Sequence, residues 1–211
     1  MGVIDDRKMY IIIVKQQFIV DTTLELIAEI GIHNINMDSI AKAANYTKRT
    51  LYTYFKSKDE ILLRVFTQDL KLRWNLQKNE IKNEISGIDK LNKWAYSLYN
   101  YCEENRQCIQ IQSFMDYNFV QIQNIRNSVL SDFESINNEL FEGLRAIFKL
   151  GITDGSIRKD LDIDLTINQF LYSFRAILNR AFKESSLLTP IEKSKYIDHY
   201  LKLFTRSIKK Q

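Results

Sequence analysis

"NMDSIAKAANYTKRTLYTYFKSKDE", residues 36–60, concentrates cations and aromatic rings to a degree that an ordinary protein surface does not require. No acidic residue occurs between Lys42 and Lys58. The rings are too closely spaced to share one buried face of a helix. This density favours contact with a molecule outside the chain. The five cations are Lys42, Lys48, Arg49, Lys56 and Lys58, and the four rings are Tyr46, Tyr52, Tyr54 and Phe55.

The same segment has the pattern of two short helices separated by a tight turn. Asn36 and Thr47 are of the residue types that cap helix N-termini, and only Asn45 and its neighbour separate the two helical patterns. Asn45 tolerates the positive φ that such a turn requires, and Ala41 leaves room for two helices to cross. A helix-turn-helix is therefore predicted. The apolar faces are formed by Met37, Ile40, Ala41 and Ala44 in the first helix and by Leu51 and Phe55 in the second.

Double-stranded DNA fits the chemistry of this segment. The second helix places polar side chains opposite Leu51 and Phe55, on the side where a major groove would lie. The tyrosines and the following lysine can bond phosphate oxygens, and helix N-termini at Thr47 and Ser57 add backbone donors. The alternative is a solvated basic surface whose tyrosines cover a small three-helix core. The predicted DNA-binding residues are Asn36, Thr47, Lys48, Arg49, Thr50, Tyr52, Thr53, Tyr54 and Lys58.

The motifs "MDSIAKAA", "LYTYF" and "KSKDEIL" occur in the order and at the spacing of a known family. From Phe18 onward, the chain resembles the tetracycline-repressor (TetR/AcrR-type) family of bacterial transcription regulators. The resemblance implies an all-α protein with a helix-turn-helix DNA-binding domain at residues 1–56 and a helical ligand-binding and dimerisation domain at residues 57–211. It also implies a homodimer on a palindromic operator and a repression that a small-molecule inducer relieves.

Three residues depart from the family pattern. Asn45 and Arg49 stand where the family usually has glycine or another small residue, and Tyr46 stands where it usually has a small aliphatic residue. Arg49 is the most informative, because its guanidinium fork near the start of the second helix could bond guanine O6 and N7. It could equally bind a phosphate, and the sequence leaves both alternatives open.

Composition predicts a mainly helical chain. Only one proline and six glycines occur among 211 residues, and 45% of residues are hydrophobic. The remaining helices are expected at residues 18–30, where Gly31 would form a left-handed C-cap, and from a capping box at Ser57 and Glu60 toward Trp74. The segment "CIQIQSF" at residues 108–114 alternates with the period of a strand, but a lone strand would lack a partner, so helix is predicted. Further helices are expected at residues 88–104, 107–122, 125–150, 163–184 and 191–209.

The last two expected helices each carry an apolar stripe suited to a four-helix bundle across a two-fold axis. Dimerisation through these stripes is predicted, as the family resemblance also implies. Burial within one subunit explains some of the same residues equally well. The predicted interface residues are Ile167, Phe170, Phe174, Ile177, Ile197, Leu201 and Phe204.

Aromatic residues are dense between Trp74 and Phe119, which suits a largely apolar or aromatic inducer. Aromatic residues at helical spacing are also ordinary core, and tyrosine hydroxyls would be the polar contacts to a ligand. The predicted pocket residues are Trp94, Tyr96, Tyr99, Phe114, Met115 and Tyr117.

Other functions lack support in the sequence. There is no glycine-rich phosphate loop and no nucleophile elbow, and His33 and His199 have no partners at catalytic or metal-ligand spacing. We therefore expect no enzymatic activity, no cofactor and no metal. The apolar run at residues 9–14 is too short to span a bilayer, and Cys102 and Cys108 without a secretion signal favour a reducing, cytoplasmic location over a disulfide framework. Architectural DNA binding, a ligandless partner-binding module and an enzyme acting on hydrophobic substrates are the alternatives.

Overall fold

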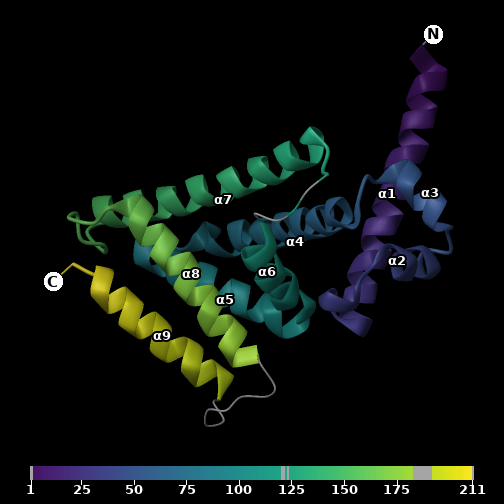
Figure 1. Ribbon diagram of the computed structural model, residues 1–211. Coiled ribbons are helices and arrows are strands. Elements are labelled where there is room, and N and C mark those ends of the chain that lie inside the picture. The colour runs from purple at the N-terminus through teal and green to yellow at the C-terminus, as the bar shows by residue number, and fades with distance from the viewer. Residues whose placement is uncertain (1, 120–121, 123, 183–191, 211) are drawn as a thin grey trace. The chain divides into compact units, whose positions relative to one another are not determined.

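The computed structural model describes residues 2–119, 122, 124–182 and 192–210, and the described chain is built of helices (Figure 1). The predicted all-helical fold is confirmed. An isolated antiparallel bridge joins Ile157 to Lys209. The α-helices are α1 Gly2–Ile30, α2 Met37–Ala43, α3 Lys48–Tyr54, α4 Lys58–Glu80, α5 Gly87–Glu104, α6 Gln107–Asn118, α7 Asn127–Asp154, α8 Ile163–Phe182 and α9 Lys193–Ile208, with short 3-10 helices η1 Ile32–Asn34 and η2 Ile81–Asn83.

The chain divides into two compact units that each combine separate parts of the sequence. The first unit comprises Met1–Lys71 and Gln110–Ile136, and the second comprises Leu72–Ile109 and Asn137–Gln211. These units are defined by which residues pack together. The predicted boundary between residues 56 and 57 separates a DNA-binding domain from a ligand-binding domain, and it stays a prediction. Packing places the segment after residue 109 with the predicted DNA-binding helices, which a cut of the linear sequence cannot represent.

Helix α1 is much longer than the helix predicted at residues 18–30, because it already begins at Gly2. The large apolar side chains at residues 9–14 lie exposed on it. At its C-terminal end the Gly31 N–H donates to Ile27 O at 2.9 Å. Gly31 has φ 78° and ψ 148°. The positive φ was expected, but the left-handed C-cap is wrong, because this ψ is extended and directs the chain away from the helix axis.

Helix α6 resolves the ambiguous "CIQIQSF" segment. Cys108, Ile111 and Met115 are all buried, and their spacing is that of one helical face. The prediction of a helix there is confirmed, although α6 ends at Asn118, before the expected residue 122. Among the described residues, no helix combines the length and the apolar character needed to cross a membrane.

Aromatic rings form much of the core of the second unit. The Phe170 ring lies 5.7 Å from the Trp94 ring, 5.7 Å from the Phe174 ring and 4.8 Å from the Phe204 ring, measured between centroids. Helices α8 and α9 lie side by side around this cluster (Figure 1). Close approach elsewhere depends on glycine: a Cβ on Gly143 would lie 2.2 Å from the Trp74 ring, so a larger residue would displace that side chain.

Contacts within one chain account for most of the stripe that was predicted at the dimer interface. Ile177 and Phe204 are only partly buried. Other large apolar side chains of the same two helices are exposed, namely Leu165, Tyr172 and Leu203. The stripe is therefore largely the core of the second unit. Its buried members are Ile167, Phe170, Phe174, Ile197 and Leu201.

Candidate nucleic-acid interface

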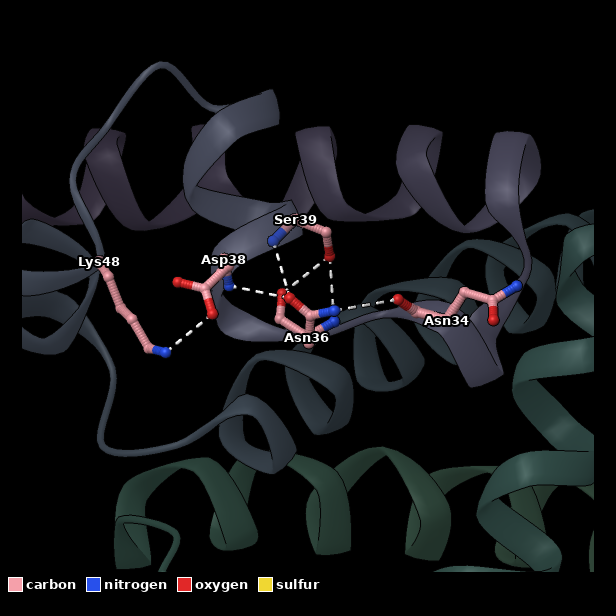
Figure 2. A network of polar contacts seen from close by, with 5 residues as sticks. All are labelled: Asn34, Asn36, Asp38, Ser39 and Lys48. Atoms are coloured by element: carbon pink, nitrogen blue, oxygen red, sulfur yellow. Dashed lines mark hydrogen bonds and ion pairs between the residues drawn. The ribbon is translucent and has the colours of Figure 1, made fainter.

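The first short helix, α2, begins at a reciprocal cap. Asn36 has an extended backbone, and its Oδ1 accepts the N–H groups of Asp38 at 3.0 Å and Ser39 at 2.9 Å. The Ser39 Oγ accepts the Asn36 N–H at 3.0 Å in return. Figure 2 shows this network, in which the Asn36 amide nitrogen points to Asn34 O at 3.5 Å. The predicted cap is confirmed, and it leaves the Asn36 amide nitrogen as the group able to meet a ligand.

The turn between α2 and α3 has the backbone that the sequence predicted. Asn45 has φ 56°, in the left-handed region that few residues other than glycine and asparagine adopt. The Tyr46 N–H donates to Ala41 O at 2.9 Å and closes the turn. Ala41 and Ala44 are buried where the helices meet, because larger side chains would hold them apart. Asn45 therefore supplies the conformation for which the family usually has glycine.

The second short helix, α3, is fixed by a threonine cap and by two anchors. Thr47 Oγ1 accepts the Thr50 N–H at 3.1 Å. Leu51 and Phe55 are fully buried one turn apart, which orients the opposite face outward. On that face Lys48, Arg49, Tyr52 and Thr53 are exposed, and Thr50 is half-buried. The predicted arrangement of polar residues opposite the two anchors is present.

Lys48 is engaged by an acidic residue of α2. Its Nζ lies 2.8 Å from Asp38 Oδ2, and both side chains are largely exposed (Figure 2). The hydrogen bond and the charge of Asp38 raise the pKa of Lys48. Because water screens an exposed ion pair, a phosphate can replace Asp38 at little cost. The pair orients Lys48 across the α2–α3 turn.

Arg49 is an exposed cation without an acidic partner among the described residues. Within the part of the chain that the structure describes, no acidic side chain pairs with its guanidinium. It follows Lys48 in the first turn of α3, beside the backbone N–H groups of the helix N-terminus. Thr53 Oγ1, one turn later, donates to Thr50 O at 2.6 Å. Arg49 therefore offers five donors to an outside ligand, while Thr53 is partly satisfied by its own helix.

The four aromatic rings of the opening segment divide into different roles. Phe55 is core. The Tyr46 ring meets the Phe18 ring edge-on at 6.3 Å and lies 6.3 Å from the Tyr54 ring, which joins α1, the turn and α3. Tyr52 is 53% exposed. Three of the four rings therefore pack inside the first unit, and whether Tyr52 and Tyr54 contact DNA stays a prediction.

A cluster of polar contacts at the C-terminal end of α3 was not predicted. Tyr54 O accepts from Gln16 Nε2 at 2.9 Å and also from Arg126 Nη2. Arg126 Nε lies 2.9 Å from Glu60 Oε1, an ion pair whose angle does not meet hydrogen-bond geometry. The Glu60 side chain is 0% exposed. The C-terminal end of α3 is therefore bonded to an arginine that lies 72 residues further along the chain.

Further contacts join Asn124 to the short segment between α3 and α4 and to the start of α4. Asn124, with φ 58°, donates from Nδ2 to Lys56 O at 3.3 Å, and its own carbonyl accepts from Ser57 Oγ at 3.1 Å. Ser57 Oγ accepts the Glu60 N–H, as predicted, but the Glu60 carboxylate accepts the Lys56 N–H at 2.8 Å. We call Asn124, Arg126 and these partners the α3–α4 clamp. No local pattern marks Asn124 or Arg126, so sequence reasoning had no signal for them.

The predicted pocket residues fall in both units. In the first, Met115 is buried, and the Phe114 ring meets the His33 ring at 5.9 Å, whereas Tyr117 is 88% exposed. In the second, Tyr96 and Tyr99 make hydrogen bonds within the chain. Whether these residues line a pocket stays a prediction. The members in the first unit are Phe114, Met115 and Tyr117, and those in the second are Trp94, Tyr96 and Tyr99.

The two predicted pocket tyrosines of the second unit, Tyr96 and Tyr99, have carboxylate partners. Tyr96 Oη donates to Asp198 Oδ1 at 2.6 Å, and Tyr99 Oη donates to Glu103 Oε1 at 2.8 Å. Burial, followed by these hydrogen bonds, raises the pKa of each phenol to about 12. Trp94 differs, because its buried indole N–H has no acceptor among the described residues. A buried donor without an acceptor costs about 1–3 kcal/mol, so a ligand acceptor at the Trp94 N–H would be favourable.

Comparison with known proteins agrees with this geometry. The sequence profile of bacterial regulatory proteins of the tetR family matches residues 19–65, which include α2, α3 and the start of α4. The fatty acid metabolism regulator protein of Bacillus subtilis (strain 168) is 26% identical over 152 residues, 72% of this chain and 75% of that protein. The HTH-type transcriptional repressor KstR2 of Rhodococcus jostii (strain RHA1) is 28% identical over 153 residues, 70% of each chain.

Solved structures share the whole fold. The crystal structure of the transcriptional regulator FadR from Bacillus subtilis in complex with stearoyl-CoA has a TM-score of 0.70. The two chains are 20% identical, and the match covers 91% of this chain and 98% of that one. A helix-turn-helix followed by a helical remainder is the architecture of DNA-binding regulators. Residues 19–65 carry the helix-turn-helix domain of the tetR family of bacterial regulatory proteins, and the chain is identified by it as a transcriptional regulator of this type.

Proposed function

We propose that the protein is a repressor that binds a palindromic operator as a homodimer and leaves it when a largely apolar small molecule binds. The observation that carries the proposal is the outward face of α3, where Arg49 is exposed beside the helix N-terminus and has no acidic partner in the described part of the chain. One such helix reads only a few base pairs, so a two-fold dimer is needed to reach useful affinity and specificity.

Base recognition is assigned to Arg49, and backbone recognition is assigned to its neighbours. The planar guanidinium fork matches guanine O6 and N7, whereas the ammonium groups of Lys48 and Lys58 act as point charges toward phosphates. Thr47 and Tyr52 present hydroxyl groups near the same face, where they would bond phosphate oxygens. This division predicts sequence discrimination at one position per half-site from Arg49 and sequence-independent affinity from the lysines.

Dimerisation is assigned to α8 and α9, through the outer faces of these helices. Phe174 and Ile197 are buried inside one chain and cannot also supply the contact surface. Tyr172 and Leu203 are 63% and 54% exposed, and such large apolar side chains favour burial against a second copy. The proposed interface therefore keeps the predicted helices and moves to their exposed apolar residues, with the partly buried Ile177 and Phe204 at its edge.

The inducer is assigned to an apolar class with at least one hydrogen-bond acceptor. Trp94 supports this assignment, because a ligand carbonyl or hydroxyl oxygen would satisfy its buried N–H. The names of two similar proteins, a fatty acid metabolism regulator and a structure with stearoyl-CoA, point to the same chemical class. The ligand must bind the form that is released from DNA more tightly than the bound form, because equal affinity would shift nothing.

Selection of bound genomic fragments from the source organism tests the proposal. We expect one palindromic motif, and its labelled duplex should bind the protein as a two-to-one complex. Fatty acids, their coenzyme A thioesters and aromatic acids are then titrated into the complex, with Trp94→Phe as the variant that removes the indole N–H and keeps an aromatic ring. A saturable release that is weaker for Trp94→Phe supports the proposal. Binding without sequence preference would instead indicate an architectural DNA-binding protein.

A further inference from the structure

The two cysteines of the chain lie in contact inside the second unit. Cys102 occupies the last turn of α5 and Cys108 the first turn of α6. Their Sγ atoms are 3.2 Å apart, and the side chains are only 2% and 1% exposed. The turn between them is closed by the Asn105 N–H, which donates to Tyr101 O at 2.9 Å, and by the Cys108 N–H, which donates to Asn105 O at 3.0 Å.

This contact brings two thiols close to bonding distance. A disulfide has a sulfur separation of about 2.05 Å, so the atoms need to approach by little more than about 1 Å. Both cysteines flank a short turn between helices, where a small rotation of either helix end supplies that movement. The pair is thus arranged for oxidation as well as for packing.

The pair lies just before the point in the sequence where the chain leaves the second unit and enters the first. Residues up to Ile109 belong to the second unit, and residues from Gln110 belong to the first. Further along α6, the Phe114 ring lies 5.9 Å from the His33 ring in the short 3-10 helix η1. That 3-10 helix directly precedes the capped N-terminus of α2. A changed start of α6 therefore acts on a helix that contacts the segment leading into the helix-turn-helix.

We propose that Cys102 and Cys108 form an intramolecular disulfide when the protein meets a hydroperoxide, and that the cross-link lowers operator affinity. The Cys108 thiolate attacks one peroxide oxygen, the O–O bond breaks, and the sulfur becomes a sulfenic acid. The Cys102 thiol then attacks that sulfur and displaces hydroxide, which leaves as water with the thiol proton. In sum, two thiols and one hydrogen peroxide give one disulfide and two waters.

The consequence for DNA rests on the proposed function, whereas the oxidation itself does not. The described arrangement of α6 and η1 belongs to the dithiol form, and the disulfide favours a different start of α6. Coupling between distant sites in proteins typically changes affinity by about 5-fold to 150-fold. We expect the operator Kd of the disulfide form to rise at least about 5-fold. Reduction should restore the original Kd.

The experiment compares wild type with Cys102→Ser and Cys108→Ser after treatment with hydrogen peroxide. Intact mass and non-reducing peptide maps measure the bond, which removes two hydrogen masses and links the peptides that carry the two cysteines. Operator binding of the untreated protein is measured first, so a failure of the proposed function is recognised before oxidation. We expect the linked peptides and the weaker binding in wild type alone, with both reversed by dithiothreitol.

Three results would overturn the proposal. The first is an unchanged protein mass after peroxide treatment, when the same peroxide oxidises free cysteine added to the sample as a control. The second is the formation of sulfinic acids or of cross-links between chains in place of the internal bond. The third is an operator Kd that stays constant although the peptide map shows complete disulfide formation. If untreated protein does not bind DNA, the peptide map alone still decides whether this thiol pair oxidises.

Discussion

The helix-turn-helix and the α8–α9 pair differ in how directly their sequences determine which side chains face outward. In α3 only Leu51 is buried, together with Phe55 at its C-cap, and the outward positions of a helix of two turns follow from these two anchors. In α8, aromatic residues occur on more than one side, so Phe170 is core while Tyr172 is exposed. The outward side chains of a short capped helix can therefore be predicted from its sequence. In a long helix rich in aromatic residues, the neighbouring helices must be known before core residues can be told from interface residues.

Removal of a core ring from α8 should have the largest effect. Phe174→Ala deletes a fully buried ring that stacks on Phe170, so we expect the free energy of unfolding to fall by about 3–5 kcal/mol. Phe174→Leu keeps most of the volume and should cost only about 1 kcal/mol. Denaturant unfolding at fixed protein concentration measures both. Nearly unchanged stability of Phe174→Ala, together with dissociation to monomers, would return this residue to the interface.

Loss of the clamp should destabilise the first unit by a smaller amount. Arg126→Ala leaves the buried Glu60 carboxylate without its cation, which costs about 3–5 kcal/mol for a fully buried pair. Because the Arg126 side chain is 32% exposed, we expect about 2 kcal/mol. Arg158→Ala, which breaks an exposed pair with Asp160, is the matched control and should cost under about 1 kcal/mol. Equal losses of stability for the two variants in thermal unfolding would show that the α3–α4 clamp does not stabilise the first unit.

A charge on the outer face of α9 should alter assembly and leave the subunit folded. Leu203→Asp replaces an exposed apolar residue, so helical content should persist while the dimer dissociates at micromolar concentration. Sedimentation velocity measures the change. Ser194→Asp introduces the same charge on the opposite side of α9 and should leave the dimer intact. A dimer that survives Leu203→Asp would place the interface elsewhere.

The smallest effect is expected at the turn between α2 and α3. Asn45 holds a left-handed backbone, so Asn45→Ala should cost about 1 kcal/mol, while Asn45→Gly should stay within about 0.5 kcal/mol of wild type. Denaturant midpoints of the two variants test this order. A reversed order would show that the Asn45 side chain, and not its backbone, stabilises the turn.

Local signals explain what the sequence could predict. The Asn36 and Thr47 caps, the left-handed Asn45 and the helical face of Cys108 and Ile111 all depend on neighbours within a few residues. The α3–α4 clamp could not be predicted, because Arg126 and Tyr54 are 72 residues apart and no repeating pattern relates them. The predicted interface stripe included core residues for a related reason. An apolar helical face has the same sequence pattern whether its neighbour belongs to the same chain or to a second copy.

The most direct test concerns the assignment of base recognition to Arg49. Arg49→Lys keeps the charge but loses the planar fork, so it separates a base contact from a phosphate contact. We predict that binding to a panel of single-base operator variants loses about 1–3 kcal/mol of discrimination at one position per half-site, with an unchanged salt dependence. Lys58→Ala should instead weaken all variants alike and reduce the salt slope by about 1 for each lysine lost. Uniform weakening of every operator variant by Arg49→Lys would contradict direct readout by α3.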